Sequence, residues 1–342
     1  MRAGSPAREG MTAVDVHDAA AHQEWMRRRH EAMGTPRAII DAQVRAATGV
    51  TPRTARRLVV GEENEVYDVT TAAGDQLIVR ISHAEDPRFE AERWALDVAR
   101  AAGVPTPVVL HVQPVAVSER RTVTFCIEEK LPGVPLDALL DGNAQPARAI
   151  SQLGEVLAAI HANPVDGFGY LQPDGRGWPI TFDSIMTDLV PRRAQVLEAA
   201  RHWQVEHRLV AAGLDALAGH VELYVYDDPR LLHGDFGPDH ILVDGEPGHE
   251  YVSGVLDLQE CAGGHPAGDL AHWLAISDKR IPLATLLATY PGGRDLMDRN
   301  TALITLMMLR RSLWMLMVDQ DRGNSSRIRD YVHTIENSLA VL

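Results

Sequence analysis

The chain has 342 residues, of which 45% are hydrophobic and 23% charged, as expected for a globular protein with one large or two medium domains. Its 47 acidic and 33 basic side chains give a formal charge of −14. This balance argues against nucleic acid as a partner, and it suits either a cationic small molecule or simply an acidic surface. Two cysteines, Cys126 and Cys261, are too few for a disulfide framework, and they indicate either a reducing, cytoplasmic location or no preference of compartment.

The chain shows no clear sign of a membrane segment. The opening residues MRAGSPAREG lack an apolar run, which argues against a signal peptide. The most apolar stretch, 302–318, is interrupted by Arg310 and Arg311, so its uninterrupted length falls short of the ~20 residues of a membrane span. We therefore expect a buried core helix there and no membrane partner.

Residues 1–50 are expected to form an N-terminal helical extension. Thr35 is placed to cap a helix that has Pro36 at its first position and ends at Gly49.

Residues 51–131 have the alternating β-branched and aromatic pattern of strands. Three strands are expected around a loop at 61–64 and a turn at 73–75. A helix from Phe89 follows and stops at Gly103, and two more strands flank a turn at 118–121. The pattern predicts a small sheet with one inserted helix.

Residues 132–342 are predicted to be mostly helical after a linker rich in proline and glycine. A single amphipathic helix is expected over 147–163, with Ile150, Leu153, Leu157 and Ile160 on one face. Two short strands at 240–244 and 252–258 interrupt the helices.

The segment HGDFGPDH, residues 233–240, lies on a short turn between two apolar runs. Asp235 is a candidate to accept the proton of an attacking hydroxyl, and His233 to brace the loop by hydrogen bonding. His240 could coordinate a metal ion, together with Asp257 at the end of the next apolar run. Asp239 is the alternative ligand, but its side chain should point away if a strand begins immediately after it.

This combination is typical of phosphoryl transfer from a nucleotide, which also needs a phosphate cradle and a cation. Gly61 could provide the cradle, although a glycine after a strand usually just makes a turn. Arg80 could provide the cation, with Glu92 or Glu90 as its partner. A lone arginine on a strand is otherwise an exposed residue.

From about Arg57 onward the chain resembles the aminoglycoside-phosphotransferase-like kinases. The similarity rests on GEENEVYDV, LIVRIS, HGDFGPDHILVD and VSGVLDLQECAGGHPAGDLAHWLA. It extends to hygromycin B kinases and to macrolide kinases, which have a histidine at the position of His240. The resemblance implies an α+β, protein-kinase-like bilobal fold. Residues 51–131 would form a small antiparallel nucleotide-binding lobe, and 132–342 a larger helical lobe with the catalytic loop and substrate pocket.

The same resemblance implies a role for each matching residue. Asp235 would be the catalytic aspartate, His240 and Asp257 the metal ligands, and His233 and Asp269 the supports of the loop. Nucleotide binding would involve Arg80, Glu92, Gly61, Asn64, Glu129 and Leu131. The implied cofactor is Mg²⁺, with Mn²⁺ better tolerated because imidazole is a softer ligand than an amide, and the implied donor is ATP or GTP.

The chain departs from the family pattern in two places. Asp257-Leu-Gln lacks the glycine found in protein kinases, and Gly264-His265-Pro266 stands where the family has Gly-Asp-Pro. We expect both departures to adjust local packing only. His161, at a predicted helix end, is expected to be structural.

The acceptor pocket is the least constrained part. Glu260, Asp188 and Trp273 are candidates to line it, with Asp183, Asp269 and Asp278 as further acids and Trp178 and Phe182 as further aromatics. The acids are alternatively solvated helix faces, and the aromatics core residues.

These observations predict an O-phosphotransferase that moves the γ-phosphate of ATP or GTP to a hydroxyl of a small antibiotic, conferring resistance. An aminoglycoside of the hygromycin type is the first candidate, and a macrolide or other natural product the next. The alternatives are a metabolic kinase acting on a sugar, choline or homoserine, and a nucleotide-binding pseudokinase. The protein is expected to act as a monomer.

Overall fold

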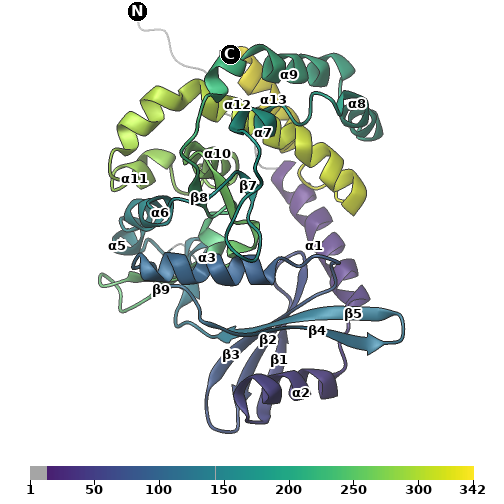
Figure 1. The fold of residues 1–342 in the computed structure, drawn as a ribbon, viewed down its shortest axis with the longest axis vertical. Coiled ribbons are helices and arrows are strands. Elements are labelled where there is room, and N and C mark those ends of the chain that lie inside the picture. The colour runs from purple at the N-terminus through teal and green to yellow at the C-terminus, as the bar shows by residue number, and fades with distance from the viewer. Residues whose placement is uncertain (1–13, 143) are drawn as a thin grey trace, which may run out of the picture.

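The computed structural model describes residues 14–142 and 144–342, with side chains from His22 onward. The expectation about the segment MRAGSPAREG lies outside the described residues. Figure 1 shows a β-sheet lobe below and a larger helical lobe above, so the predicted bilobal α+β fold is confirmed. Cys126 and Cys261 are both buried and free.

The smaller lobe is built on a five-stranded antiparallel sheet with the strand order β1-β2-β3-β5-β4. The strands are β1 (Pro52–Leu58), β2 (Asn64–Thr71), β3 (Gln76–Ser82), β4 (Val109–Ser118) and β5 (Arg121–Glu129). The inserted helix α3 (Phe89–Ala101) lies between the sheet and the helical lobe, whereas α2 (Arg37–Thr48) covers the opposite face (Figure 1). Helix α1 (Val14–Ala32) runs along one side from the helical lobe toward the sheet.

The core of this lobe follows the alternation seen in the sequence. Ile40 and Val44 of α2 pack against Val69, Val79 and Phe125 of the sheet, and all five are at most 1% exposed. The burial of one strand face against an amphipathic helix explains why these strands could be predicted.

The predicted N-cap of α2 is wrong. Pro36 is the capping residue, and the Thr35 hydroxyl instead donates to Glu65 Oε1 at 2.8 Å. The predicted end is confirmed, because Gly49 adopts φ 75° and its N–H donates to Arg45 O.

The larger lobe contains the remaining helices and two small sheets. The helices are α4 (Leu136–Asp141), α5 (Ala147–Ile150), α6 (Leu153–His161), α7 (Phe182–Met186), α8 (Arg193–His202), α9 (His207–Gly219), α10 (Ala267–Ile276), α11 (Leu283–Leu287), α12 (Gly293–Arg322) and α13 (Ile328–Val341). The sheets are β10-β9-β6, from β6 (Val134–Pro135), β9 (Ile241–Asp244) and β10 (Tyr251–Val255), and β7-β11-β8, from β7 (Gly169–Tyr170), β8 (Arg230–Leu232) and β11 (Ala262–Gly264).

The single helix expected over 147–163 is instead two helices, α5 and α6, with a turn between them. The Ser151 hydroxyl donates to Arg148 O at 2.7 Å, and Gln152 Oε1 accepts the N–H of Val252 at 2.8 Å. Side-chain bonds of this kind compete with the regular helix.

Helix α12 contains the most apolar segment. By length and composition it is the one helix in the described part of the chain that could cross a bilayer, so the expectation that this segment is too short is wrong. Half of its most apolar stretch is nevertheless buried inside the protein. Leu306, Leu309, Leu313 and Leu316 are fully buried and belong to the core that α12 shares with α8, α9, α10 and α13. A core helix of a globular protein meets the same length and composition criteria.

Candidate active site

The loop 233–240 connects β8 to β9, and hydrogen bonds of the His233 side chain fix its backbone. The buried His233 side chain donates from Nε2 to Leu256 O at 3.0 Å and accepts the N–H of Asp235 at Nδ1 at 3.2 Å. Burial, together with the neighbouring His240, lowers the pKa of His233 to about 4. The ring is therefore neutral at pH 7, which these two opposite hydrogen-bonding roles require.

Asp269, in the first turn of α10, fastens the same loop. Its carboxylate accepts the backbone N–H of His233 and of Gly234, each at 2.9 Å, and bonds with His161 Nε2 at 2.9 Å. Burial alone would raise the pKa of Asp269, but the hydrogen bond and charge of His161, the charge of His233 and the N–H of Gly234 together hold the pKa below its usual value. Gly234 has φ 85°, and a Cβ there would overlap the carbonyl of Glu260. Asp269 is 1% exposed, so its alternative placement in the acceptor pocket is wrong.

Asp235 projects from this loop and pairs with His272, a residue that the sequence analysis missed. His272 Nε2 lies 2.9 Å from Asp235 Oδ1, and the Asp235 side chain is 38% exposed. Burial favours a higher pKa for Asp235, but the hydrogen bond from His272 and the neighbouring histidines hold the pKa well below its usual range. Asp235 is therefore an ionised carboxylate with one oxygen held and the other available.

His240 and Asp257 lie beside Asp235. His240 Nδ1 donates to the backbone carbonyl of Asp235 at 2.8 Å, so Nε2 faces Asp257 Oδ2 at 3.7 Å and Asp239 Oδ2 at 3.6 Å. Burial alone would lower the pKa of His240, but Asp239, Asp235 and Asp257 together raise it to about 9. The expectation that Asp239 points away is wrong, because residues 238–240 form a 3₁₀ turn rather than the start of the strand.

The donor set can be tested for its fit to a metal ion. Among the residues that the structure describes, no group of three or more His, Cys, Asp or Glu side chains is arranged to hold a metal by itself. Mg²⁺ in nucleotide-dependent enzymes is held by one or two carboxylates plus substrate phosphates, so a sparse set is what such a site needs. Asp257 Oδ2 and His240 Nε2 face each other, with Nδ1 of the imidazole fixed by a carbonyl. These residues fit a metal shared with a nucleotide.

Arg80 joins the sheet to this cluster. It is 7% exposed, and its guanidinium lies 2.6 Å from Glu92, 3.3 Å from Glu128 and 3.4 Å from Asp257. Burial, with the crowding of carboxylates around one guanidinium, raises the pKa of Glu92 and of Glu128. Glu90, the alternative partner, pairs instead with Arg93 on the outer face of α3. The Arg80 guanidinium is thus fixed by Glu92 of α3, and it also lies close to Asp257, a candidate metal ligand.

A family model described as a phosphotransferase enzyme family matches residues 54–299, which is most of the chain. The chain belongs to this family. Its members transfer phosphoryl groups, so the loop, the carboxylates and the buried arginine belong to a phosphotransferase enzyme.

Solved structures support the kinase-like fold of this phosphotransferase. The aminoglycoside phosphotransferase APH(4)-Ia is 20% identical, with 88% of this chain and 97% of that chain covered and a TM-score of 0.69. A Thermobifida fusca protein described as a fructosamine-3-kinase is 22% identical, with 88% and 98% covered and a TM-score of 0.61. The GDP and kanamycin complex of APH(2″)-IIIa is 16% identical, with 88% and 98% covered and a TM-score of 0.60. No curated protein sequence matches the chain significantly.

The glycine loop of the phosphotransferase, residues 59–63, is fastened by helix α1. Gly61 has the positive φ expected of a turn, 71°, and its carbonyl bonds with His30 Nε2 at 3.0 Å. Arg29 bonds with the carbonyl of Glu62. Asn64, expected among the nucleotide ligands, begins β2 and donates to Gln259 Oε1 at 3.1 Å. Its amide therefore ties the loop to the segment after Asp257.

The two departures from the family pattern have structural uses. Gln259, two residues after Asp257, links Asn64 to the carbonyl of Pro87 before α3. His265 accepts the N–H of Ala267 at 3.0 Å at the start of α10 and packs against Tyr226 with ring centroids 4.3 Å apart. The His265 contacts are local packing, as expected, whereas Gln259 joins segments far apart in the chain, so the expectation of local packing is wrong for Gln259.

The expected hinge of the phosphotransferase is only partly available to a nucleotide. The backbone N–H of Glu129 donates to Val108 O at 3.0 Å, and that of Lys130 to Gln76 O at 3.1 Å. The N–H of Glu129 is therefore already engaged, and the assignment of the Glu129 to Leu131 backbone to purine binding stays a prediction. Leu131 remains a candidate for purine binding, whereas the side chain of Glu128, just before the hinge, turns inward to Arg80.

The three residues expected to line the acceptor pocket differ in burial and in their partners. Trp273 is fully buried, donates to Ile281 O at 2.9 Å and stacks near Phe236, so it is a core residue and not a substrate contact. Asp188 forms a two-armed ion pair with Arg310, at 2.9 and 2.7 Å. Glu260 lies 3.9 Å from Arg88, and its side chain is 42% exposed, so it remains a candidate.

The further acids and aromatics expected in the acceptor pocket also differ in their exposure. Phe182 is buried in the core, Trp178 is 53% exposed, and Asp183 is exposed on α7. Asp278 accepts the N–H of Leu283 at 2.7 Å at the start of α11, which gives it a capping role.

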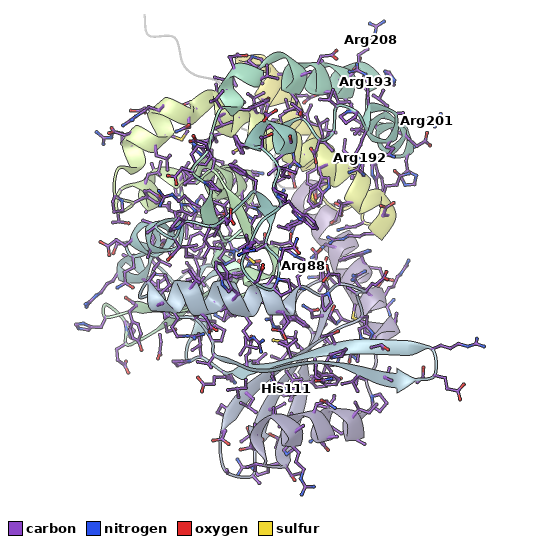
Figure 2. The ribbon with its side chains drawn as sticks, viewed as in Figure 1. Arg88, His111, Arg192, Arg193, Arg201 and Arg208 are labelled. Atoms are coloured by element: carbon purple, nitrogen blue, oxygen red, sulfur yellow. The ribbon has the colours of Figure 1, made fainter. Side chains whose placement is uncertain are left out.

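Arg88, labelled in Figure 2 just above α3 and placed at the N-cap of that helix, was not anticipated. Its backbone has φ 56°, and its guanidinium donates to Cys261 O at 2.9 Å and stacks 4.0 Å over the ring of Tyr170. These contacts hold the start of α3 against the helical lobe, close to Glu260.

Replacing His272 by glutamine should lower kcat by about 10- to 100-fold, because the loss of one hydrogen bond to a charged group costs roughly 1.5–3 kcal/mol and leaves the Asp235 side chain free to rotate. The KM for the nucleotide should stay within about twofold, since His272 contacts Asp235 and not Arg80. Steady-state kinetics measure both constants. His333→Gln, an exposed change on α13, is the control. If His272→Gln and His333→Gln have the same kcat, His272 does not position Asp235.

Proposed function

We propose that this phosphotransferase moves the γ-phosphate of ATP or GTP to a hydroxyl of a small antibiotic, first of all an aminoglycoside, and so confers resistance. The observation that carries the proposal is the Asp235 carboxylate, ionised and partly exposed, with His240, Asp257 and Arg80 beside it. The net charge of −14 suits a cationic acceptor. Solved complexes of APH(4)-Ia with hygromycin B and of APH(2″)-IIIa with kanamycin support this acceptor class.

In the proposed reaction Asp235 orients the acceptor hydroxyl and takes its proton as the oxygen attacks the γ-phosphorus in line. His272 holds Oδ1, so Oδ2 is the oxygen that meets the hydroxyl. His233 and Asp269 keep the loop from moving when the charge on Asp235 changes.

On the donor side, Arg80 would face the phosphates from β3, in an orientation that Glu92 and Glu128 fix from behind. Asp257 and His240 would hold Mg²⁺ or Mn²⁺, which neutralises phosphate charge when bound. The donor assignment to ATP or GTP is supported by relatives solved with ADP, AMP-PNP or GDP.

The proposed benefit to the cell is electrostatic. A phosphate adds a charge of about −2 to the antibiotic, which weakens its attraction to a negatively charged target. The cytoplasm, where the donor nucleotide is available, is the proposed location, and a monomer the proposed state.

A second candidate function is favoured by the similarity to the protein described as a fructosamine-3-kinase. It would be a metabolic kinase that phosphorylates a sugar-derived or other small metabolite with the same catalytic residues. A third possibility, a nucleotide-binding pseudokinase, predicts binding without turnover.

The deciding experiment measures nucleotide consumption with each acceptor in turn. The purified protein is given ATP or GTP with hygromycin B, kanamycin, a macrolide, a fructosamine or choline, and cells expressing it are tested for growth on the antibiotics. We expect turnover with an aminoglycoside and a matching rise in resistance. Turnover only with a fructosamine or choline would establish the metabolic alternative, and nucleotide binding without turnover on the whole panel would favour the pseudokinase.

Replacing His240 by asparagine should retain activity but shift the metal preference toward Mg²⁺ over Mn²⁺, because an amide oxygen is a harder ligand than an imidazole nitrogen. The ratio of kcat/KM in Mg²⁺ to that in Mn²⁺ measures the shift. His249→Asn, on the turn between β9 and β10, is the control. An unfolded His240→Asn protein, judged by circular dichroism, would mean that His240 is structural.

A further inference from the structure

A cavity of about 820 Å³ lies apart from the catalytic loop, where helix α1 meets the sheet and the end of α12. Its walls include Trp25, Arg29 and Met33 from the N-terminal segment, Arg121 from the start of β5 and Arg322 from the end of α12. The volume is typical of sites for small organic molecules, which span roughly 300–1,000 Å³. Asp235, His240, Asp257 and Arg80 are not among the lining residues.

The cavity is basic although the protein is acidic. Arg28, Arg29, Arg121 and Arg322 line it, against the single acid Glu63, while the whole chain has a charge of −14. Such a local reversal of sign is not expected from composition, and it attracts anions.

Among the described residues, Arg29 and Arg121 are the two lining arginines without a carboxylate partner. In the part of the chain that the structure describes, no carboxylate lies within 4.0 Å of either guanidinium. Arg29 bonds with the carbonyl of Glu62, and Arg121 with His83 Nδ1 at 2.7 Å. By contrast, Arg322 pairs with Glu62 and Glu63, and Arg28 with Glu24. An anion between Arg29 and Arg121 would supply the missing counter-charge.

The remaining wall suits a flat apolar group. The Trp25 ring is fixed by its Nε1–H, which donates to Arg322 O at 3.1 Å, and Arg29 lies 5.5 Å from the ring centroid. Met33 and Ala84 continue this surface. A ring placed there would stack on Trp25 while its acidic group meets the guanidinium groups.

We propose that this cavity is a second binding site, for an organic anion that combines an aromatic ring with a phosphate, sulfonate or carboxylate group. The negative group bonds to Arg29 and Arg121, and the ring stacks on Trp25. The ligand links α1 to β5, and α1 already holds the carbonyls of Gly61 and Glu62. The site lies apart from Asp235, His240, Asp257 and Arg80 and adjoins the glycine loop through Glu63.

The test uses naphthalene-2-sulfonate as the probe and isothermal titration calorimetry of the full chain. We expect binding that weakens about tenfold in Arg121→Gln and again in Arg29→Gln, since each change removes a charge-assisted hydrogen bond. Neutral naphthalene-2-methanol should bind at least tenfold more weakly than the sulfonate. Using two variants from different elements guards against misfolding of one.

Arg120→Gln provides a matched control. It removes the same charge from the neighbouring exposed residue, which does not line the cavity, and binding should stay within twofold. Equal weakening in Arg120→Gln and Arg121→Gln would overturn the site, as would the absence of binding to the wild-type chain at millimolar probe. Saturating AMP-PNP should leave probe binding intact, and displacement of the probe would show that it occupies the nucleotide site instead.

Discussion

Replacing Asp235 by asparagine should lower kcat by about 10³-fold, within the 10²–10⁴-fold range of a positioned general base. The amide keeps the size of the side chain and can still bond to His272, but it cannot take a proton from the acceptor hydroxyl. Nucleotide affinity should change little, because Arg80 and Asp257 are untouched. Steady-state phosphorylation of the acceptor and equilibrium binding of AMP-PNP measure the two effects.

The control for this change is Asp239→Asn. It removes the same charge from the adjacent carboxylate, which lies 3.6 Å from His240 but makes no contact with His272. We expect kcat within about fivefold of the wild-type value. If Asp235→Asn retains near wild-type turnover, or if Asp239→Asn is the more damaged variant, the assignment of the base to Asp235 is wrong.

Replacing Arg80 by methionine should destabilise the protein by about 3–5 kcal/mol, the usual consequence of removing one partner of a buried ion pair. Glu92 and Glu128 would be left buried without their counter-charge, and Asp257 would lose its contact with the sheet. Chemical denaturation measures the free energy of unfolding. Arg56→Met, which breaks an exposed pair with Asp68 on the same sheet, should cost less than about 1 kcal/mol.

A second variant separates charge from packing at this site. Adding Glu92→Gln and Glu128→Gln to Arg80→Met removes the unpaired charges, and it should recover part of the lost stability. If the triple variant is no more stable than Arg80→Met, the loss comes from packing around Phe89 and not from uncompensated carboxylates.

The sequence predicted those site residues that lie close together along the chain. His233, Asp235 and His240 lie on one short turn between two strands. Such a turn has few possible backbone conformations, so the spacing of the three residues indicates how their side chains are placed. The order of strand and helix limited the partner of Arg80 to Glu92 or Glu90 on the next helix, and the family resemblance implied Glu92. The choice of Glu92 over Glu90 depended on which face of α3 is buried.

The residues that the sequence analysis missed come from elsewhere in the chain. His272 lies 37 residues after Asp235 and reaches it only because α10 packs behind the loop. Its spacing of three from Asp269 was the available signal, since residues three apart share a helix face. Glu128 was not named either, although successive residues of a strand face opposite sides of the sheet, so that Glu128 is buried beside Arg80 while the neighbouring Glu129 is exposed.

The acceptor residues show the same division. Trp273 and Asp188 were named from residue type alone, and type does not reveal burial or an existing partner. Trp273 is enclosed in the core, and Asp188 is neutralised by Arg310 of α12.

By itself, the sequence determined the two-lobed α+β order and the catalytic loop, because periodicity and short spacings control structure that is local, whereas the pairing of Arg80 with Glu92 followed from the family resemblance. Only the tertiary structure decided which histidine holds Asp235, which carboxylates share Arg80, and that α1 grips the glycine loop and closes a basic cavity beside it. Each of these depends on groups far apart in the chain, and the packing of helices against the sheet, rather than any local pattern, brings them within bonding distance.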